Sequence, residues 1–241
     1  MTDKRKLGIL GGLGPMASVI FYKMITEHTK ATCDQDHLDV IVLSGASTPD
    51  RTDFITGKCD VSPLPKMIEG IELLENAGAE IISVPCNTAH FFYDELNKAS
   101  RVPVLNIVEL TAGYIKRTGA KRVGLLATDG TIQSGSYKRE CDRLGMECIV
   151  PDEENQKIIM DIIYNKIKNN NDTDPTDFFK VAQTLHDQNC DCLLIGCTEL
   201  SLIPLKNAPA GLKFIDSLEV LAKVSIEECG CEPIGFDNLE L

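Results

Sequence analysis

The sequence predicts an α/β protein made of two similar Rossmann-like domains with mainly parallel sheets. Short apolar runs alternate with helical stretches along the chain, which is typical of parallel strands joined by helices. Several of these runs consist almost entirely of Val, Ile and Leu, as expected for strands that helices cover on both faces. Two sequence landmarks also recur at nearly equal spacing, which indicates an internal duplication.

The predicted strands are short apolar runs bounded by glycine, proline or polar residues. In chain order they are residues 6–10, 40–44, 81–84, 104–106, 122–127, 147–150, 192–195 and 213–215.

The predicted helices lie between these strands. Pro15 suits the first turn of a helix over 17–30, and Gly78 ends a helix over 63–77. Isoleucines spaced at the 3.6-residue helical period predict a helix over 155–168. The remaining predicted helices are 177–188 and 218–229, and the asparagine-rich segment 169–174 is predicted to be a surface loop.

The duplication is visible in two pairs of segments. Gly8, inside the first strand, recurs as Gly124, 124 − 8 = 116 residues later, and Cys86 recurs as Cys197, 197 − 86 = 111 residues later. Strands of Val, Ile and Leu resemble one another by chance, but the repeated cysteine near a threonine favours duplication. We therefore predict one domain from 1–113 plus 214–241 and a second from 114–213.

Charge and hydropathy exclude several classes of protein. The chain has 241 residues with 36 acidic and 24 basic side chains, a net charge of 24 − 36 = −12. Such an acidic chain is not expected to bind nucleic acid or an anionic membrane surface, because both need basic patches. No apolar run approaches the ~18–20 residues that span a bilayer. The N-terminus has no pattern of a signal peptide, so we expect a cytoplasmic protein whose ten cysteines are reduced thiols.

Two glycine- or cysteine-rich patterns give weak alternative predictions. Gly12-Leu13-Gly14 with Ala17 fits the loose pattern of a dinucleotide-binding turn, but the second strand lacks the acidic residue that holds a ribose. Cys190-Asp191-Cys192 and Cys229-Gly230-Cys231 do not have the spacing of zinc sites. We therefore predict no cofactor and no metal.

Cys86 and Cys197 are the strongest candidates for chemistry. Each follows a predicted buried strand and precedes residues suited to begin a helix, Asn87-Thr88 and Thr198. Ligands bind at this edge of open α/β sheets, and a helix N-terminus is expected to lower a thiol's pKa toward neutrality. Two facing thiols suit inversion of a stereocentre, because one takes a proton from one face while the other supplies it to the opposite face. His90, four residues after Cys86, is near enough to tune that thiol.

These motifs resemble one enzyme family. Pro85-Cys86-Asn87-Thr88-Ala89-His90, Gly196-Cys197-Thr198-Glu199 and Gly11-Gly12-Leu13-Gly14-Pro15 are together similar to the aspartate/glutamate racemases, in particular the aspartate-racemase branch. The resemblance covers essentially the whole chain. It implies a homodimeric isomerase without pyridoxal phosphate, with the active site in the cleft between two similar α/β domains. It also implies that Cys86 and Cys197 are the catalytic pair, with Cys86 serving the D-substrate and Cys197 the L-substrate.

The resemblance also assigns substrate-binding residues. Arg51, in a turn after the second strand, matches the family's substrate arginine and is able to clamp a carboxylate. Lys168 matches the lysine that binds a substrate carboxylate in this family. Tyr164 is expected one turn earlier on the same face of the predicted helix 155–168. The remaining expected donors to the substrate carboxylate are Asn87, Thr88, Thr128 and Thr198.

The predicted function is racemisation of aspartate, a small acidic amino acid. Three alternatives stay open from the sequence. The first is a relative of the same fold acting on glutamate, on a broad range of amino acids or on a hydantoin. The second is a non-catalytic protein that binds an anionic metabolite. The third is a dehydrogenase, which would bind a nicotinamide dinucleotide.

Overall fold

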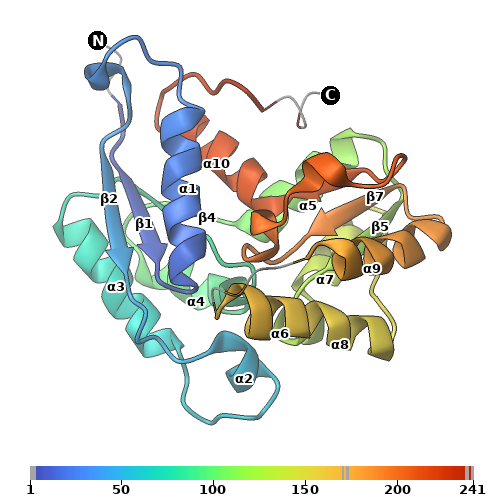
Figure 1. The fold of residues 1–241 in the computed structure, drawn as a ribbon. Helices are drawn as coiled ribbons and strands as arrows, with labels where there is room; N and C mark the ends of the chain where they lie inside the picture. The colour runs from blue at the N-terminus through green and yellow to red at the C-terminus, as the bar shows by residue number, and fades with distance from the viewer. Residues whose placement is uncertain (1–3, 170, 172–173, 237–238, 240–241) are drawn as a thin grey trace.

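The computed structural model describes residues 4–169, 171, 174–236 and 239 and contains two four-stranded parallel sheets with helices around them (Figure 1). The strand order is β2-β1-β3-β4 in the first sheet and β6-β5-β7-β8 in the second. The two orders are the same once four is added to each strand number. The two-domain α/β fold predicted from the sequence is therefore confirmed.

The first sheet is built around β1 (Leu7–Gly11), which is buried along its whole length. Its partners are β2 (Val40–Ser44), β3 (Ile81–Ser83) and β4 (Val104–Leu105). The surrounding helices are α1 (Pro15–Glu27), α2 (Arg51–Ile55), α3 (Leu64–Asn76), α4 (Tyr93–Ala99), α5 (Ile107–Arg117) and the 3-10 turns Asp34–Asp36 and Thr88–Phe92.

The second sheet is built around β5 (Arg122–Leu126), with partners β6 (Glu147–Ile149), β7 (Cys192–Ile195) and β8 (Phe214–Asp216). Its helices are α6 (Asp129–Ser134), α7 (Ser136–Arg143), α8 (Glu153–Asp161), the π-helix Ile162–Ile167, α9 (Thr176–Asp187), α10 (Ser217–Glu228) and the 3-10 turns Leu200–Leu202 and Leu205–Asn207.

The helices α5 and α10 occupy equivalent places in the two halves, after β4 and β8. They lie between the sheets in Figure 1, and one hydrophobic core joins residues of β1, β5 and both helices. Ser225 of α10 also hydrogen-bonds Ser83 of β3, with 2.8 Å between the hydroxyl oxygens. The chain therefore returns to the first half through α10. The predicted domain boundary at 213/214 is wrong for β8, because Phe214–Asp216 pairs with β7 in the second sheet.

All eight predicted strands are present, with ends that differ by one residue at most. Four α-helices were not predicted: α2, α5, α6 and α7. The division of the predicted helix 155–168 into α8 and a π-helix was not predicted either. In the π-helix the amide of Lys168 donates to the carbonyl of Ile163, 3.0 Å away and five residues back. Of the predicted loop 169–174, residues 170, 172 and 173 lie outside the described residues.

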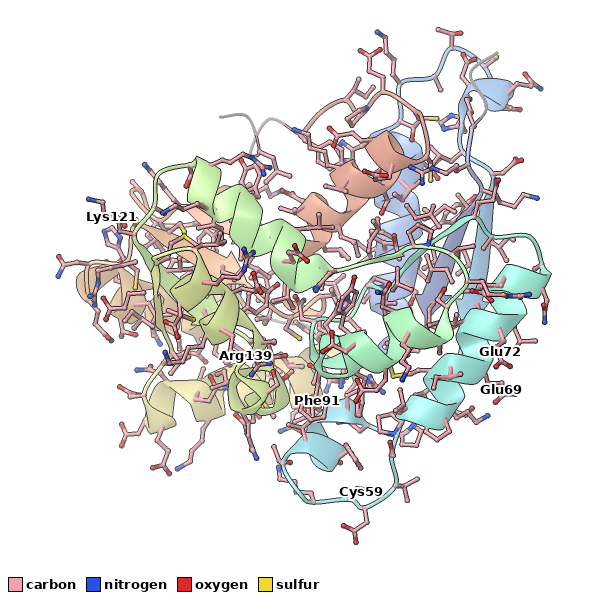
Figure 2. All side chains as sticks on the ribbon, turned by 180° about the vertical axis from the view of Figure 1, so that it is seen from behind. Cys59, Glu69, Glu72, Phe91, Lys121 and Arg139 are labelled. Atoms are coloured by element: carbon pink, nitrogen blue, oxygen red, sulfur yellow. The ribbon has the colours of Figure 1, made fainter. Side chains whose placement is uncertain are left out.

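Charged side chains of both signs lie at the outer surface. Glu69 and Glu72, on the outward face of α3, point away from the molecule, and Lys121 lies at the far end of the second half (Figure 2). Within the described part of the chain, no helix has the length and apolar character needed to cross a membrane.

Candidate active site

One small cavity, of about 10 Å³, lies between the two halves at the carboxyl ends of their strands. The structure brings all eight predicted site residues to its wall: Arg51, Cys86, Asn87, Thr88, Thr128, Lys168, Cys197 and Thr198. Five further residues line it: Leu13, Asp50, Thr52, Tyr164 and Glu199. The space is about what one water molecule needs, so the two halves are closed on each other.

Cys86 enters the cavity from the first half, after β3. It is 6% exposed, and its backbone amide donates to the carbonyl of Val84 at 2.7 Å. A 3-10 turn, Thr88–Phe92, follows it before α4 begins. His90 does not act on the thiol: its Nδ1 lies 2.8 Å from the carbonyl oxygen of Cys86, and its Nε2 accepts from the amide of Ile107 at 3.2 Å. Burial lowers the pKa of His90, so this histidine is a neutral backbone anchor.

Cys197 enters from the second half, after β7, and is 4% exposed. Its Sγ donates to Oε2 of Glu199 at 3.1 Å. The helix predicted to begin at Thr198 is absent, because only the 3-10 turn Leu200–Leu202 follows. Thr198 instead donates its hydroxyl to the carbonyl of Pro85, 3.2 Å away in the first half.

The pKa values of both thiols are raised, contrary to the prediction from helix N-termini. Burial is the main cause for Cys86, although Arg51 and the amide of Ala89 favour its thiolate. Burial, the negative charge of Glu199 and the hydrogen bond to that carboxylate raise the pKa of Cys197 well above the ordinary value. Desolvation of a thiolate in a closed cavity therefore outweighs the short helical turns that follow each cysteine.

A cluster of threonine hydroxyls joins the halves beside the cysteines. Thr88 Oγ1 lies 2.9 Å from Oγ1 of Thr128 and 2.8 Å from Oγ1 of Thr131. Thr128 also caps α6 by accepting from the amide of Thr131. This contact places Thr88 and Thr128, which were predicted separately as donors, within one hydrogen-bonded cluster.

The side chain of Asn87 is held at both ends. Its Nδ2 donates to Ser217 Oγ at 3.0 Å, and its Oδ1 accepts from the hydroxyl of Tyr137 at 2.5 Å. The sequence suggested that Asn87 caps the following helical turn, but its side chain makes no such hydrogen bond. The two bonds to Ser217 and Tyr137 fix the side chain and link β3 to the second half, and one amide hydrogen is left over as a donor toward the cavity.

Arg51 is the first residue of α2, capped by Asp50, rather than part of an isolated turn. Its Nη2 donates to the carbonyl of Leu13 at 2.5 Å and its Nη1 to that of Pro49 at 2.9 Å. Nε is buried and has no hydrogen-bond partner among the described residues. Arg51 is 7% exposed, so its positive charge acts within the cavity.

Lys168 and Tyr164 approach Asp50 from the opposite half. Lys168 Nζ lies 3.4 Å from Oδ2 of Asp50 and 3.8 Å from the centroid of the Tyr164 ring. The Tyr164 hydroxyl donates to Asp50 Oδ1 at 3.1 Å. Burial alone would lower the pKa of Lys168, but the negative charges around it, that of Glu199 first, raise it, so the ammonium stays protonated.

Asp50 and Glu199 were not predicted as site residues, and they change the electrostatics of the site. The sequence pointed to a local cationic site made by Arg51 and Lys168. The two carboxylates offset both cations, so the cavity holds two positive and two negative side chains. Burial alone would raise the pKa of Asp50, but Lys168 and the amide of Asp53 lower it, and the carboxylate stays ionised. The signal for Glu199 in the sequence was its place in the motif Gly196-Cys197-Thr198-Glu199.

A second cavity of about 370 Å³ adjoins the first and shares Asp50, Arg51, Lys168 and Glu199 with it. Gly12 and Gly14, at the start of α1, line its other side. Gly12 has a φ of +84°, and a Cβ there would lie 2.4 Å from the backbone nitrogen of Gly45. The glycines thus serve close packing of loops, which accounts for their pattern without a dinucleotide. Among the described residues, no group of three His, Cys, Asp or Glu side chains is arranged to hold a metal ion.

Comparisons with known proteins point to one family. The profile of the Asp/Glu/hydantoin racemases matches residues 10–224. The broad-specificity amino-acid racemase RacX of Bacillus subtilis is 32% identical over 228 residues, which cover 91% of this chain and 96% of RacX. The aspartate racemase of Picrophilus torridus is 32% identical, with a TM-score of 0.82 over 98% of each chain.

More distant solved structures share the fold. Glutamate racemase from Thermus thermophilus, in complex with β-chloro-D-alanine, has a TM-score of 0.61 at 21% identity, over 95% of this chain and 82% of that one. At that identity the likeness concerns the architecture of two similar α/β halves.

Proposed function

Because this chain belongs to the Asp/Glu/hydantoin racemase family, we propose that it interconverts L- and D-aspartate by two-base proton transfer without a cofactor. The observation that carries the proposal is the pair of buried thiols. Cys86 and Cys197 come from different halves of the molecule and line the same cavity.

The proposed chemistry moves one proton off the α-carbon and another onto it. The thiolate of one cysteine takes the α-proton, and the electron pair left on the carbon is delocalised into the α-carboxylate. The thiol of the other cysteine then protonates the opposite face and becomes the thiolate. Cys197 is the base for L-aspartate and Cys86 for D-aspartate, so each turnover exchanges the roles of the two thiols.

The polar wall of the cavity supports binding of a dicarboxylic amino acid. Arg51 and Lys168 supply positive charge for its carboxylates. Thr88, Thr128 and Thr198, with Asn87, supply hydrogen bonds where negative charge builds up as the proton leaves. These donors come from both halves, so closure of the cleft assembles the site.

The closed cavity is too small for an amino acid, so substrate access requires the halves to separate. The adjoining 370 Å³ cavity gives the route, because its wall toward the thiols consists of Asp50, Arg51, Lys168 and Glu199. Contacts between the halves, such as that of Lys168 with Asp50, must open and re-form in each cycle.

A second candidate is a broad-specificity amino-acid racemase of the same fold. The size of the adjoining cavity favours it, since a long side chain has room there while the α-carbon lies between the thiols. The similarity to RacX points in the same direction. Aspartate remains the first proposal because two cations, Arg51 and Lys168, line the small cavity between the thiols, which we call the inner cavity.

One experiment tests both candidates. The protein is incubated in deuterium oxide with each of a panel of L-amino acids. The enantiomers are then separated by chiral chromatography, and their deuterium content is measured by mass spectrometry. Aspartate racemisation with one deuterium at the α-carbon supports the first proposal, and turnover of other side chains at similar rates supports the second. Binding without any exchange would indicate a non-catalytic binding protein and contradict both.

Further parts of the proposal concern cofactor, assembly and compartment. We propose that activity needs no pyridoxal phosphate, that the active form is a homodimer, and that it works in the reducing cytoplasm, where Cys86 and Cys197 stay as thiols. Racemisation by protein without absorbance of a bound pyridoxal group, and the mass in solution, test the first two parts. Loss of activity on oxidation and its recovery with a reductant test the third.

A further inference from the structure

We propose that Glu199 binds the α-ammonium group of the substrate, so that this site selects free amino acids over hydantoins. The inference rests on the proposed function and deepens it by naming the chemical class of the substrate. The family as a whole covers amino acids and hydantoins. A hydantoin is a cyclic ureide whose nitrogen on the α-carbon is acylated and uncharged.

The two oxygens of the Glu199 carboxylate have different surroundings. Oε2 accepts from Cys197 Sγ at 3.1 Å and lies 3.5 Å from the hydroxyl oxygen of Thr198. Oε1 is buried and has no hydrogen-bond partner among the described residues. The side chain is 5% exposed. A buried carboxylate oxygen without a donor is costly, so the site is built for a donor that arrives with the ligand.

Gly14 of the opposite half lies close to this oxygen. A Cβ atom on Gly14 would lie 2.3 Å from Oε1 of Glu199, so any larger residue at position 14 would force the carboxylate to move. Both residues line the larger cavity, and Glu199 lines the inner cavity as well. A group that enters from the larger cavity therefore meets Glu199 before it reaches the thiols, which line the inner cavity alone.

Arg51 provides the complementary unpartnered atom. Its Nε is buried without a hydrogen-bond partner among the described residues, while both Nη atoms donate to backbone carbonyls. Of the four charged side chains that line the inner cavity, Glu199 and Arg51 thus each have an unused hydrogen-bonding atom. An amino acid carries an ammonium and a carboxylate on the same carbon and matches both, whereas a hydantoin matches neither charge.

The test compares two ligands that differ in the ammonium group alone. Racemic aspartate is used, so that turnover does not change its composition, and succinate is the same dicarboxylate without the ammonium. Their dissociation constants are measured by calorimetry for the wild-type protein and for Glu199→Gln. Glu72→Gln, on the outward face of α3, is the matched control (Figure 2).

The wild-type protein is expected to bind aspartate at least about 10-fold more tightly than succinate. Glu199→Gln is expected to weaken aspartate binding by about 10- to 100-fold, the range of a charge-assisted hydrogen bond, and to leave succinate binding within about 3-fold. Glu72→Gln is expected to change neither constant. Equal loss of both ligands, or a fall in kcat with unchanged aspartate affinity, would show that Glu199 acts only on Cys197 and would overturn the proposal.

The wild-type comparison stands by itself if Glu199→Gln does not fold. Equal affinities for aspartate and succinate in the wild-type protein would already contradict an ammonium site. Failure of the proposed function gives a different result, because no amino acid would then exchange its α-hydrogen in the wild-type protein, whatever Glu199 binds.

Discussion

Lys168 Nζ lies 3.4 Å from Oδ2 of Asp50, and this ion pair joins the second half of the molecule to the first at the mouth of the cavity. Both side chains are about three-quarters buried, at 25% and 28% exposure. The lysine is therefore held, protonated, where a substrate carboxylate would compete with Asp50 for it.

Replacing Lys168 with Met should weaken substrate binding more than it slows the chemistry. We expect KM for aspartate to rise by roughly 10- to 100-fold, since a partly buried charge-assisted contact is lost. Lys166→Met is the matched control on the same helix, because Lys166 only approaches Asp161 and Asp177 at 3.7 and 3.9 Å. Equal KM values for the two variants would remove Lys168 from the binding site.

The pH dependence of the reaction should follow the thiols. Burial raises the pKa of Cys86 and of Cys197, so the thiolate that we propose as the base is scarce at neutral pH. We expect kcat/KM to rise with pH through the neutral range, by up to about tenfold per pH unit below the pKa of the base. Initial rates from L- and from D-aspartate across this range provide the measurement, and a flat profile would exclude a thiol as the base.

Glu199→Gln should shift that profile in a defined direction. The charge of Glu199 raises the pKa of Cys197, so its removal lowers this pKa and moves the rise to lower pH. The shift should be larger for the reaction from L-aspartate, in which Cys197 is the proposed base. An equal shift from both enantiomers would contradict the proposed assignment of the two faces.

The contact between Gly14 and Glu199 predicts a selective effect of one methyl group. Gly14→Ala places a Cβ atom 2.3 Å from Oε1 and should displace the Glu199 carboxylate, with a loss of about 10-fold in kcat/KM. Gly113→Ala in α5 is the control, since nothing lies within 4 Å of its added Cβ atom. Its melting temperature should be unchanged or higher, because Ala suits a helix interior better than Gly. Equal activity of both variants would show that turnover does not depend on the position of the Glu199 carboxylate opposite Gly14.

The buried carboxyl group of Asp216 should make the free energy of unfolding depend on pH. It caps α10, is 5% exposed, and burial raises its pKa to about 7. The folded protein thus retains a proton that the unfolded chain releases near pH 3.9. The stabilisation that comes from this bound proton is fully present below about pH 4. It is lost as the pH rises through 7, and the free energy of unfolding falls by up to about 1.4 kcal/mol per pH unit.

Asp216→Asn tests this term, because Asn106 already caps α5 at the equivalent place in the first half. The variant should gain stability relative to wild type as pH rises from about 4 to 7, as measured by urea unfolding. A difference between the two proteins that stays constant over this range would show that Asp216 titrates normally.

Much of the fold was predictable because the strands are strongly apolar and repeat between the halves. The helix α5 escaped prediction, since Ile107, Val108 and Ile115 are β-branched and favour strands. Tertiary burial and the Asn106 cap stabilise it as a helix instead. The polar capping residue was the available signal.

The positions of the site residues were also predictable, but their electrostatics were not. The strand ends and the family motifs bring Cys86, Cys197, Arg51 and Lys168 together. The raised pKa values of the thiols depend on how completely the halves close, which no local pattern encodes. The same closure buries Glu199 beside Cys197, so a motif residue that had no assigned role becomes a charged part of the cavity wall.

The central claim is that Cys86 and Cys197 act as two bases on opposite faces of one carbon. Its most direct test is α-hydrogen exchange with deuterium oxide in Cys86→Ser, Cys197→Ser and the double variant, each supplied separately with L- and D-aspartate. We predict that each single variant loses racemisation but still exchanges one enantiomer: L-aspartate with Cys197 intact, and D-aspartate with Cys86 intact. The double variant should exchange neither, and racemisation by the double variant would contradict the account.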